Sequence, residues 1–308
     1  MSRPLVSVLI NNYNYGRFLD RALDSALQQT GPSAEVIVVD DGSTDDSRAV
    51  IERRGSAVRA IFQPNRGQAA AMNAAVAASC GQILCFLDAD DWWHPGKLAE
   101  TVKAFDLNPG TGLVYHRLQP VRSRSLTNDP PVPRTLCHGD LSARMARSAG
   151  VWPYPMTSAI SVLSDAMAQV GPIPSGFVIS ADAWLVGAIP FLWRVTSLPQ
   201  TLGSYRVHNN NWHRDRDDAQ MLRRRMAHWE MTVAELNAFL IARNQNWHLS
   251  LADHFPHRAA SAQLAPPDLP GRVGLFLDGI RFAGEPNPLR RLRDAMRVLR
   301  RARRDGTS

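Results

Sequence analysis

Cysteine is scarce in this chain of 308 residues, and the spacing of the few that occur excludes several kinds of site. Cys80, Cys85 and Cys137 form neither a CxxC pair nor the ligand spacing of a zinc site. Cys80 and Cys85 lie in or beside an apolar stretch, so we expect both to be buried, reduced thiols. This cysteine usage is typical of a reducing compartment, and we expect a cytoplasmic protein.

Long apolar runs and glycine-rich phosphate loops are also missing. No run approaches the roughly 20 apolar residues that a membrane-spanning helix needs. No segment near residue 1 combines a basic start, an apolar core and a cleavage site, so we expect no secretion signal. The sequence contains neither GxGxxG after its first apolar run nor GxxxxGK[ST]. Its polar loops instead offer carboxylates and an aromatic residue, which favours a nucleotide bridged by a metal ion.

Positive charge is confined to one part of the chain. Nine arginines and two acidic residues lie between 281 and 304, a balance that equals the net charge of +7 of the whole chain. The remainder is close to neutral, so we expect no nucleic-acid partner. In this segment Leu289, Leu292, Met296 and Leu299 share one helical face. Residues 288–304 therefore form either an amphipathic helix on an anionic membrane or a solvated or self-associating helix.

The stretch from Ile83 to Trp93 combines five apolar residues, three carboxylates and two tryptophans. A short unbroken apolar run is typical of a strand covered on both faces. Carboxylates at its C-terminal end would lie in the crevice where open α/β sheets bind ligands. Asp88, Asp90 and Asp91 crowd like charges, which a hard cation such as Mn²⁺ or Mg²⁺ would offset. In the alternative interpretation, Asp91 caps a helix that begins at Trp92.

Apolar periodicity predicts the order of the elements around this stretch. Strands are expected over residues 5–10, 35–39, 57–62 and 83–87, and helices over 18–27, 68–78 and 95–105. A helix is also expected between the second and third strands, after a turn that supplies its caps. The βαβαβαβα order predicts an α/β fold with a doubly wound, mostly parallel sheet and flanking helices.

Four motifs in this order carry a resemblance to a known family. They are Val6-Ser7-Val8-Leu9-Ile10-Asn11-Asn12-Tyr13-Asn14, Val38-Val39-Asp40-Asp41-Gly42-Ser43-Thr44-Asp45, Asn65-Arg66-Gly67 with Ala71-Met72-Asn73, and Phe86-Leu87-Asp88-Ala89-Asp90-Asp91 with Pro95 and Lys97-Leu98. This set resembles glycosyltransferase family 2, of the GT-A fold. Gly171-Pro172-Ile173, Ala181-Asp182 and Tyr205-Arg206-Val207-His208 extend the resemblance to about residue 210.

The chain departs from the family pattern at two places. Ala181 stands where the acidic pair usually begins with Glu, and Asn11-Asn12 stands where the first loop usually carries Pro-Thr. The second departure bears on which base or sugar is accepted.

The resemblance implies an inverting, metal-dependent transferase. It implies movement of a hexosyl or N-acetylhexosaminyl group from a nucleoside-diphosphate sugar, with UDP or dTDP favoured. The acceptor would be a hydroxyl of a glycan, a lipid-linked or a protein-linked molecule, as in polysaccharide biosynthesis. We expect a cytoplasmic enzyme with peripheral contact at the inner face of the membrane. The alternative is a non-catalytic sugar-nucleotide-binding module of the same fold.

The same resemblance implies roles in nucleotide binding. Asp40 would accept the imide N–H of uracil or thymine, Tyr13 would stack on the base, and Asn11 would lie beside them. Asp88 would bind the ribose, and Arg66 would face the diphosphate. The alternatives without nucleotide contact are a turn or cap role for Asp40, a packed loop aromatic for Tyr13 and a solvated loop arginine for Arg66.

The catalytic and metal roles fall on three further residues. Asp90 and His208 would hold Mn²⁺ or Mg²⁺, and Asp182 would take the proton of the acceptor hydroxyl. Asp182 precedes an apolar helical pattern, and a helix N-terminus would keep its carboxylate ionised. The alternatives are an N-cap role for Asp182 and a structural role for His208. Residues 209–216 are expected to form a loop that orders over the bound donor.

These assignments divide the chain into three parts. Residues 1–110 form the predicted nucleotide-sugar-binding half of a GT-A domain, and residues 111–216 form its acceptor and catalytic half. Residues 217–308 form a helical extension that ends in the basic amphipathic tail.

Overall fold

The computed structural model describes residues 5–122, 125–126, 129–208 and 218–301. The chain forms two compact units. The first, the sheet unit, comprises Met1–Asp140 and Tyr154–Arg214. The second, the helical unit, comprises Leu141–Pro153 and Asp215–Ser308. The three-part division at residues 110 and 216 stays a prediction.

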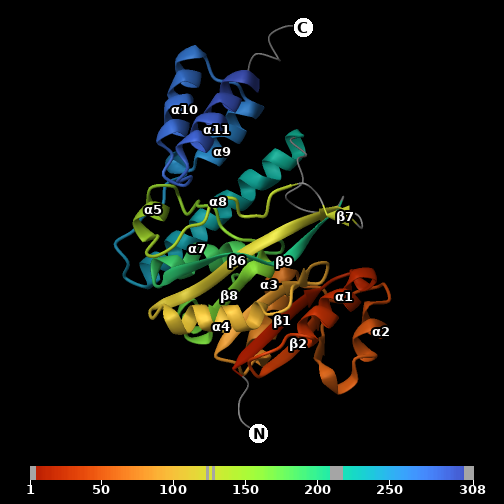
Figure 1. Ribbon diagram of the computed structural model, residues 1–308. Coiled ribbons are helices and arrows are strands. Elements are labelled where there is room, and N and C mark those ends of the chain that lie inside the picture. Colours follow the sequence, from red (N-terminus) through yellow and green to blue (C-terminus); the bar gives the residue numbers. More distant parts are fainter. Residues whose placement is uncertain (1–4, 123–124, 127–128, 209–217, 302–308) are drawn as a thin grey trace. The chain divides into compact units, whose positions relative to one another are not determined.

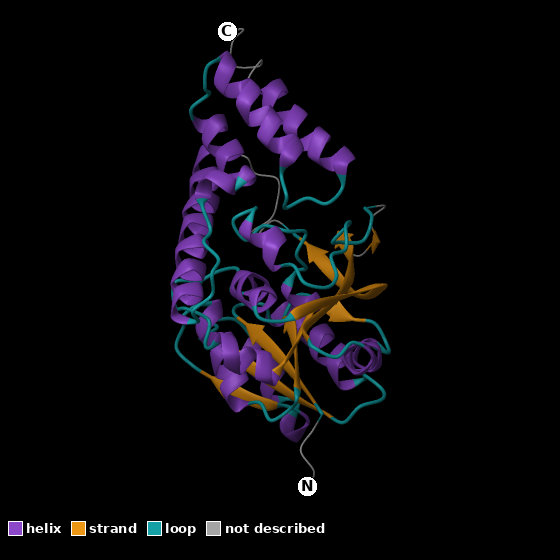
Figure 2. Cartoon of the chain, turned by 90° about the vertical axis from the view of Figure 1, so that its left-hand side faces the viewer, coloured by secondary structure: helices purple, strands orange, loops and turns teal. Residues whose placement is uncertain are grey.

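Strands of the described residues join in one sheet within the sheet unit (Figures 1 and 2). They are β1 (Val6–Asn12), β2 (Ala34–Asp40), β3 (Arg59–Phe62), β4 (Ile83–Asp88), β5 (Trp92–Trp93), β6 (Thr111–Arg122), β7 (Ser125–Leu126), β8 (Ile160–Leu163) and β9 (Arg194–Val207). The order is β3-β2-β1-β4-β8-β6-β9-β5, with β7 paired to β6. Strands β1 to β4 are parallel, whereas β8 runs antiparallel to both β4 and β6.

The helices of the sheet unit lie on both faces of this sheet (Figure 2). They are α1 (Gly16–Leu27), α2 (Ser47–Glu52), α3 (Gln68–Ala78), α4 (Lys97–Leu107), α6 (Ser164–Val170) and α7 (Asp182–Ala188). The predicted doubly wound α/β fold is therefore confirmed.

Alternation along β1 shows how the sheet is covered on both faces. Val6, Val8 and Ile10 are buried in one core cluster with residues of α1, α2 and α4. Side chains at the intervening positions point to the opposite face, and Leu9 is 1% exposed there. Helix α3 packs against β1 and β2, and its alanines let it approach closely. This double cover explains why the strands read as unbroken apolar runs.

One alternative interpretation and one prediction are wrong. Asp91 does not cap a helix, because Trp92–Trp93 forms β5 and pairs antiparallel with β9. The next helix, α4, begins at Lys97, after Gly96 in the left-handed region. Cys80 is exposed rather than buried, because it lies in the turn between α3 and β4. Cys85 and Cys137 are buried thiols.

The helical unit contains α5 (Ser142–Ala146), α8 (Ala219–Ala242), α9 (Phe255–Leu264), α10 (Leu269–Arg281) and α11 (Pro288–Arg301). Asp218 caps α8 by accepting a hydrogen bond from the Met221 N–H, at 2.9 Å. Gly279 lies where α9, α10 and α11 meet, and a Cβ there would lie 2.7 Å from the Phe255 ring and 2.8 Å from Ala295. Among the described residues, no helix has the length and apolar character needed to cross a membrane.

Candidate functional site

A cavity of about 480 Å³ opens at the C-terminal ends of β1 and β4, as expected for an open α/β sheet. Its wall is built from segments that are far apart in the sequence but belong to the sheet unit. It includes five of the predicted site residues, namely Asn11, Tyr13, Asp88, Asp90 and Asp182. We call this space the acidic cavity, because three of these five residues are aspartates.

Asp88 and Asp182 share the wall of the acidic cavity and influence each other. Burial, with Asp90 and Asp182 nearby, raises the pKa of Asp88 to about 7. Asn11 Nδ2 donates a hydrogen bond to Asp88 Oδ1 at 3.1 Å and partly offsets this effect. The hydroxyl of Thr157 lies between Asp88 and Asp182 and lowers the pKa of whichever carboxylate accepts its proton. Two like charges thus lie close together with few donors, which is the situation that a cation relieves.

Asp182 is the first residue of α7, as the sequence predicts. The expected electrostatic consequence is wrong, however, because burial outweighs the helix N-terminus and raises the pKa of Asp182 to about 6. Ser180, two residues earlier, has a φ of 54° in the left-handed region. The turn at Ser180 leads the chain into α7 at the cavity wall. At neutral pH the carboxylate still predominates, so Asp182 is able to accept a proton.

Asp90 and His208 lie together although 118 residues separate them in the sequence. His208 Nε2 lies 2.8 Å from Asp90 Oδ2. The imidazole is stacked on Phe18, with ring centroids 5.9 Å apart, and is tilted against Tyr15 at 5.6 Å. These rings hold His208 in place. The predicted loop over residues 209–216 falls outside the described residues.

Asp90 lines the acidic cavity, whereas His208 does not line it and reaches the site through its contact with Asp90. This pair fits a divalent cation that takes most of its ligands from substrate. Within the described ranges no group of three His, Cys, Asp or Glu side chains is close enough to hold a metal. Asp90 and His208 offer one carboxylate oxygen and one imidazole nitrogen. Mg²⁺ is commonly bound by one or two carboxylates together with substrate phosphates and water, so the pair fits that pattern.

Asp91 belongs to the framework of the site. Ser158 Oγ donates to Asp91 Oδ2 at 2.6 Å, and the Arg206 backbone N–H donates to Oδ1 at 2.8 Å. Burial and the neighbouring carboxylates raise its pKa well above the usual range. Arg206 Nε also donates to the Asp90 carbonyl, at 2.9 Å. Asp91 thereby fastens the acidic turn to β9, the strand that leads to His208.

Two residues of adjacent strands, Asp40 and Asn12, bear on the predicted binding of the base. Asp40 is buried and does not line the cavity, and both of its carboxylate oxygens accept hydrogen bonds, from Asn12 Nδ2 at 2.7 Å and from Ser43 N at 3.1 Å. Asn12 does line the cavity, and its Oδ1 is buried without a hydrogen-bond partner among the described residues. Tyr13 is 45% exposed at the rim. The free acceptor of Asn12 is therefore available to a base N–H, with Asp40 orienting the amide.

The side chain of Arg66 is exposed and does not line the cavity, so its predicted contact with the diphosphate stays a prediction. Its loop is nevertheless fixed. The backbone N–H groups of Arg66 and Gly67 donate to the Asp41 carboxylate at 3.0 and 2.8 Å. Gly67 has a φ of 87°, and a Cβ there would lie 2.9 Å from a methyl group of Val178. Only glycine allows this close approach of the loop to the segment before α7.

Two residues of the site that the sequence did not single out are Gln68 and Thr157. Gln68 Oε1 accepts from the Ala181 N–H at 3.0 Å, and its Nε2 lies 3.4 Å from Asp88 Oδ1. Gln68 thus links Asp88 with the turn before Asp182. The only sequence signal for Gln68 is its place after Asn65-Arg66-Gly67, and the only one for Thr157 is its place in the proline-rich stretch from Trp152 to Ser158.

Comparisons with known proteins find relatives and solved structures similar to this chain. The model of glycosyl transferase family 2 matches residues 7–138. An uncharacterized glycosyltransferase of Nostoc sp. is 34% identical over 265 residues, which are 82% of this chain and 81% of that protein. Over 115 residues, or 36% of this chain, the identity to the chondroitin synthase of Pasteurella multocida is 38%. This match spans 12% of the synthase.

Two solved structures share the fold. TarS of S. aureus, in complex with UDP, has a TM-score of 0.57 and 18% identity, with 98% of this chain and 92% of that chain covered. The mannosyltransferase PcManGT from Pyrobaculum calidifontis, in complex with GDP-Man and Mn²⁺, has a TM-score of 0.55 and 21% identity. In that match 98% of this chain and 87% of the other are covered.

Proposed function

The chain belongs to glycosyltransferase family 2, and from this premise we propose that it transfers a sugar, with inversion, from a nucleoside-diphosphate sugar to a hydroxyl group. The observation that carries the proposal is the convergence of Asp88, Asp90 and Asp182 on one cavity. A cluster of carboxylates this close together is unfavourable unless a proton or a cation is bound among them. The hexosyl or N-acetylhexosaminyl type of the transferred group belongs to the same proposal.

Asp90 and His208 would hold the divalent cation, Mn²⁺ or Mg²⁺, against the donor diphosphate. When bound, the cation offsets the negative charge that develops on the leaving diphosphate. The contact of 2.8 Å between the two side chains supports this pairing. PcManGT, described in complex with GDP-Man and Mn²⁺, offers a precedent for metal and donor together in this fold.

Asp182 would act as the general base. An alcohol is a weak nucleophile at neutral pH, so a carboxylate must take its proton as the oxygen attacks the anomeric carbon. The new carbon–oxygen bond forms on the face opposite the bond that breaks, and the diphosphate leaves with that electron pair. A pKa of about 6 leaves Asp182 ionised at neutral pH yet basic enough to accept the proton.

The donor would be UDP- or dTDP-linked. The imide N–H of uracil or thymine would donate to Asn12 Oδ1, whose amide is oriented by Asp40, and Tyr13 would stack on the base at the rim. TarS, which was crystallised with UDP, supports a uridine donor in this fold. Asn11 and Asp88, which are hydrogen-bonded to each other, would receive the ribose hydroxyls.

The acceptor would be a hydroxyl of a glycan, a lipid-linked or a protein-linked molecule. Similarity to a chondroitin synthase over 115 residues supports a glycan. We place the enzyme in the cytoplasm, with peripheral membrane contact through residues 288–304. Exposed Leu289, Leu292 and Met296 on α11 support this contact.

The test is a screen of nucleotide sugars for donor hydrolysis and for thermal stabilisation, with and without Mn²⁺. We expect one donor to stabilise the protein only with the metal and to be turned over. An Asp182→Asn variant should bind that donor and lose turnover. A non-catalytic sugar-nucleotide-binding module of the same fold would bind the donor equally well with either residue and hydrolyse it with neither. This second result would overturn the proposed catalysis.

A further inference from the structure

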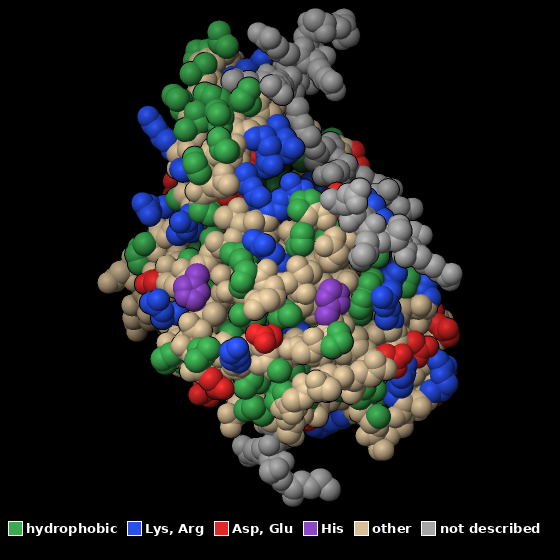
Figure 3. Space-filling model, viewed as in Figure 1, with side chains coloured by type: hydrophobic (Ala, Val, Ile, Leu, Met, Phe, Trp, Pro, Cys, Tyr) green, Lys and Arg blue, Asp and Glu red, His purple; other side chains and the backbone are tan. Residues whose placement is uncertain are grey.

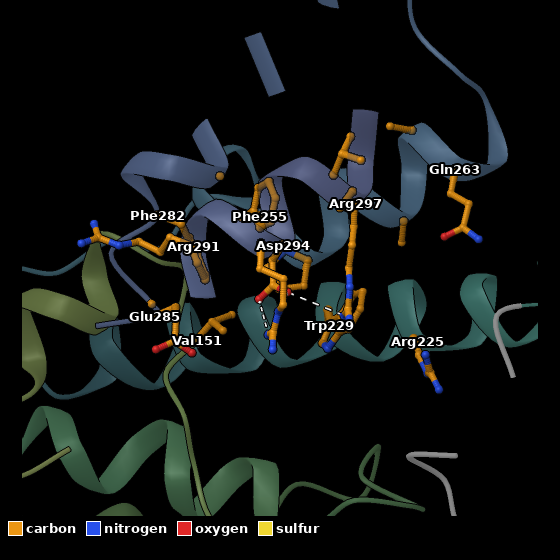
Figure 4. A pocket seen from close by; sticks show the side chains of 18 of the residues that line it. Val151, Arg225, Trp229, Phe255, Gln263, Phe282, Glu285, Arg291, Asp294 and Arg297 are labelled. Atoms are coloured by element: carbon orange, nitrogen blue, oxygen red, sulfur yellow. Dashed lines mark hydrogen bonds and ion pairs between the residues drawn. The ribbon is translucent and has the colours of Figure 1, made fainter. Parts of the chain in front are cut away.

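The helical unit contains a cavity of its own, of about 450 Å³ (Figure 4). This volume lies in the range of pockets that bind small molecules. Its lining comes from α8, α9, α10, α11, the connection between α10 and α11, and residues 151–153, all within the helical unit. We call it the arginine cavity. Nothing in the proposed transfer reaction uses it.

Apolar and aromatic side chains form much of the lining of the arginine cavity. Trp229 on α8 and Phe255 on α9 line it together with Phe282 after α10. The rings of Phe255 and Phe282 pack with centroids 5.6 Å apart, and Ala259 and Ala260 leave space beside them. A wall of this kind favours contact with hydrocarbon, because contact between apolar surface and water is unfavourable.

The same lining also carries charged side chains, which lie between and beside the aromatic rings (Figure 4). Arg225, Arg291, Arg293 and Arg297 line the cavity against two carboxylates, Asp294 and Glu285. Figure 4 shows Arg297 and Asp294 reaching from α11 toward α8, which carries Trp229 and Arg225. The lining therefore has an excess of positive charge.

The carboxylates do not satisfy all of these arginines. Asp294 is shared, since Arg293 Nε lies 2.8 Å and Arg297 Nη1 3.7 Å from its Oδ1. Arg291 Nε is buried and has no hydrogen-bond partner in the part of the chain that the structure describes. A buried, unsatisfied guanidinium N–H is unfavourable in the free protein. It is the group that an anion would satisfy, with a charge-assisted hydrogen bond.

We propose that the arginine cavity binds a single membrane lipid with a phosphate head group, whose phosphate lies on Arg291 and its neighbours and whose chain lies on the aromatic wall. The charge excess selects an anion, and the aromatic wall selects a hydrocarbon chain attached to it. A free phosphate would leave the apolar wall exposed to water.

The outer surface of α10 and α11 favours a lipid taken from a membrane. Val273, Leu277 and Ile280 on one face of α10 are 47%, 42% and 36% exposed, and apolar residues of α11 are exposed as well. In Figure 3, hydrophobic side chains gather over this helix pair, with Lys and Arg side chains beside them. Such a surface can rest on an anionic bilayer while the cavity accepts one of its lipids.

Brominated lipid provides the test, because bromine on an acyl chain quenches tryptophan fluorescence on contact. The full chain is mixed with phosphatidylcholine vesicles that either lack or contain phosphatidylglycerol with brominated chains, and separately with inorganic phosphate. We expect quenching only with brominated phosphatidylglycerol, and a smaller quenched fraction in Trp229→Phe. Asp182→Asn should be quenched like the wild type, so this result does not depend on glycosyl transfer.

Paired variants separate binding in the cavity from adsorption to the surface. Arg291→Gln removes the unsatisfied cation, and Arg281→Gln removes an equal charge from an exposed position of α10 outside the cavity. We expect Arg291→Gln to weaken apparent binding ~10–100-fold without lowering the melting temperature, and Arg281→Gln to weaken it about fivefold at most. Ala259→Phe should fill the cavity and abolish quenching, whereas Ala265→Phe, at an exposed site outside the cavity, should not.

Three results would overturn the proposal. Equal losses in Arg291→Gln and Arg281→Gln would mean that the vesicle only adsorbs to surface charge. Quenching that persists in Ala259→Phe would place the chain outside the cavity. Stabilisation by inorganic phosphate that requires Arg291, without quenching by brominated lipid, would define a site for a soluble anion instead.

Discussion

The acidic cavity and the arginine cavity are alike in volume, about 480 and 450 Å³, but opposite in charge and construction. The first lies where parallel strands end, and β1, β4 and the start of α7 fix its carboxylates. The second lies among helices, and its guanidinium groups are carried on long side chains. Each gathers like charges that its own neighbours offset only in part. From this comparison we infer that charge left uncompensated in a cavity indicates the kind of ligand that binds there.

The side chains of the two cavities respond differently to uncompensated charge. A carboxylate can respond by binding a proton, and burial accordingly raises the pKa values of Asp88 and Asp182 to about 7 and 6. A guanidinium group cannot respond in this way at accessible pH. Arg291 Nε stays buried without a hydrogen-bond partner among the described residues. The acidic cavity should therefore be sensitive to pH, whereas the arginine cavity should be sensitive to salt.

The largest expected effect is on catalysis in the acidic cavity. Asp182→Asn should lower kcat for glycosyl transfer ~10²–10⁴-fold, because the amide cannot accept the acceptor proton. The dissociation constant of the donor should change little. Steady-state kinetics and calorimetry measure the two quantities. Asp165→Asn, at an exposed position of α6, provides the control. Turnover within tenfold of wild type would remove Asp182 from the role of base.

The next effect is on binding of the metal and donor. Asp90→Ala should abolish the rise in melting temperature that UDP with Mn²⁺ produces in the wild type, because the cation loses its carboxylate ligand. Thermal unfolding followed by fluorescence measures the shift. Asp106→Ala, at an exposed position of α4, should keep it. If Asp90→Ala kept the full shift, the cation would have to be bound elsewhere.

A third effect follows from the pKa of Asp182. Because burial raises this pKa to about 6, the carboxylate needed for proton transfer is protonated below that pH. Below about pH 6 the ratio kcat/KM should therefore fall about tenfold for each pH unit. Above this pH the ratio should level off. A pH–rate profile of the free enzyme with limiting donor checks this. If kcat/KM fell only below about pH 4, burial would not control the pKa of Asp182.

The smallest effect is on stability. Without metal, Asp88→Asn should stabilise the protein at pH 8 by about 1–3 kcal/mol, since the folded state disfavours the charged form. The sign follows from the raised pKa: between about pH 4 and 7 the folded state binds more protons, so wild-type stability falls as pH rises. Urea unfolding in EDTA at pH 5 and pH 8 measures the difference. A variant that is less stable at pH 8 would contradict this explanation.

The sequence predicted the elements whose pattern is local. The apolar run from Ile83 specified β4, and the alanine-rich stretch from Gln68 to Ala78 specified α3 with the bounds observed. The family motifs led to Asp88, Asp90 and Asp182, which do line one cavity. Local order was enough for Asp88 and Asp90, because the carboxyl ends of the adjacent parallel strands β1 and β4 lie together. Asp182 lies at the start of α7, and only the family resemblance pointed to it.

Features that depend on distant residues were not predicted. The sequence placed Asp91 in a crowded acidic turn or, alternatively, at a helix cap, but it is held by Ser158 and Arg206, which follow it by 67 and 115 residues. The pKa of Asp182 depends on burial by other segments, so its place at a helix N-terminus gave the wrong direction. The arginine cavity arises from the packing of four helical segments, and periodicity within α11 showed only an amphipathic helix.

The central claim is that the carboxylates of the acidic cavity hold a divalent ion against a diphosphate. A crystal structure with UDP and Mn²⁺, with diffraction recorded at the manganese absorption edge, tests it most directly. We predict an anomalous peak within coordination distance of the Asp90 carboxylate, His208 Nε2 and both phosphates of UDP. UDP bound in the cavity with no manganese near Asp90 would contradict the claim.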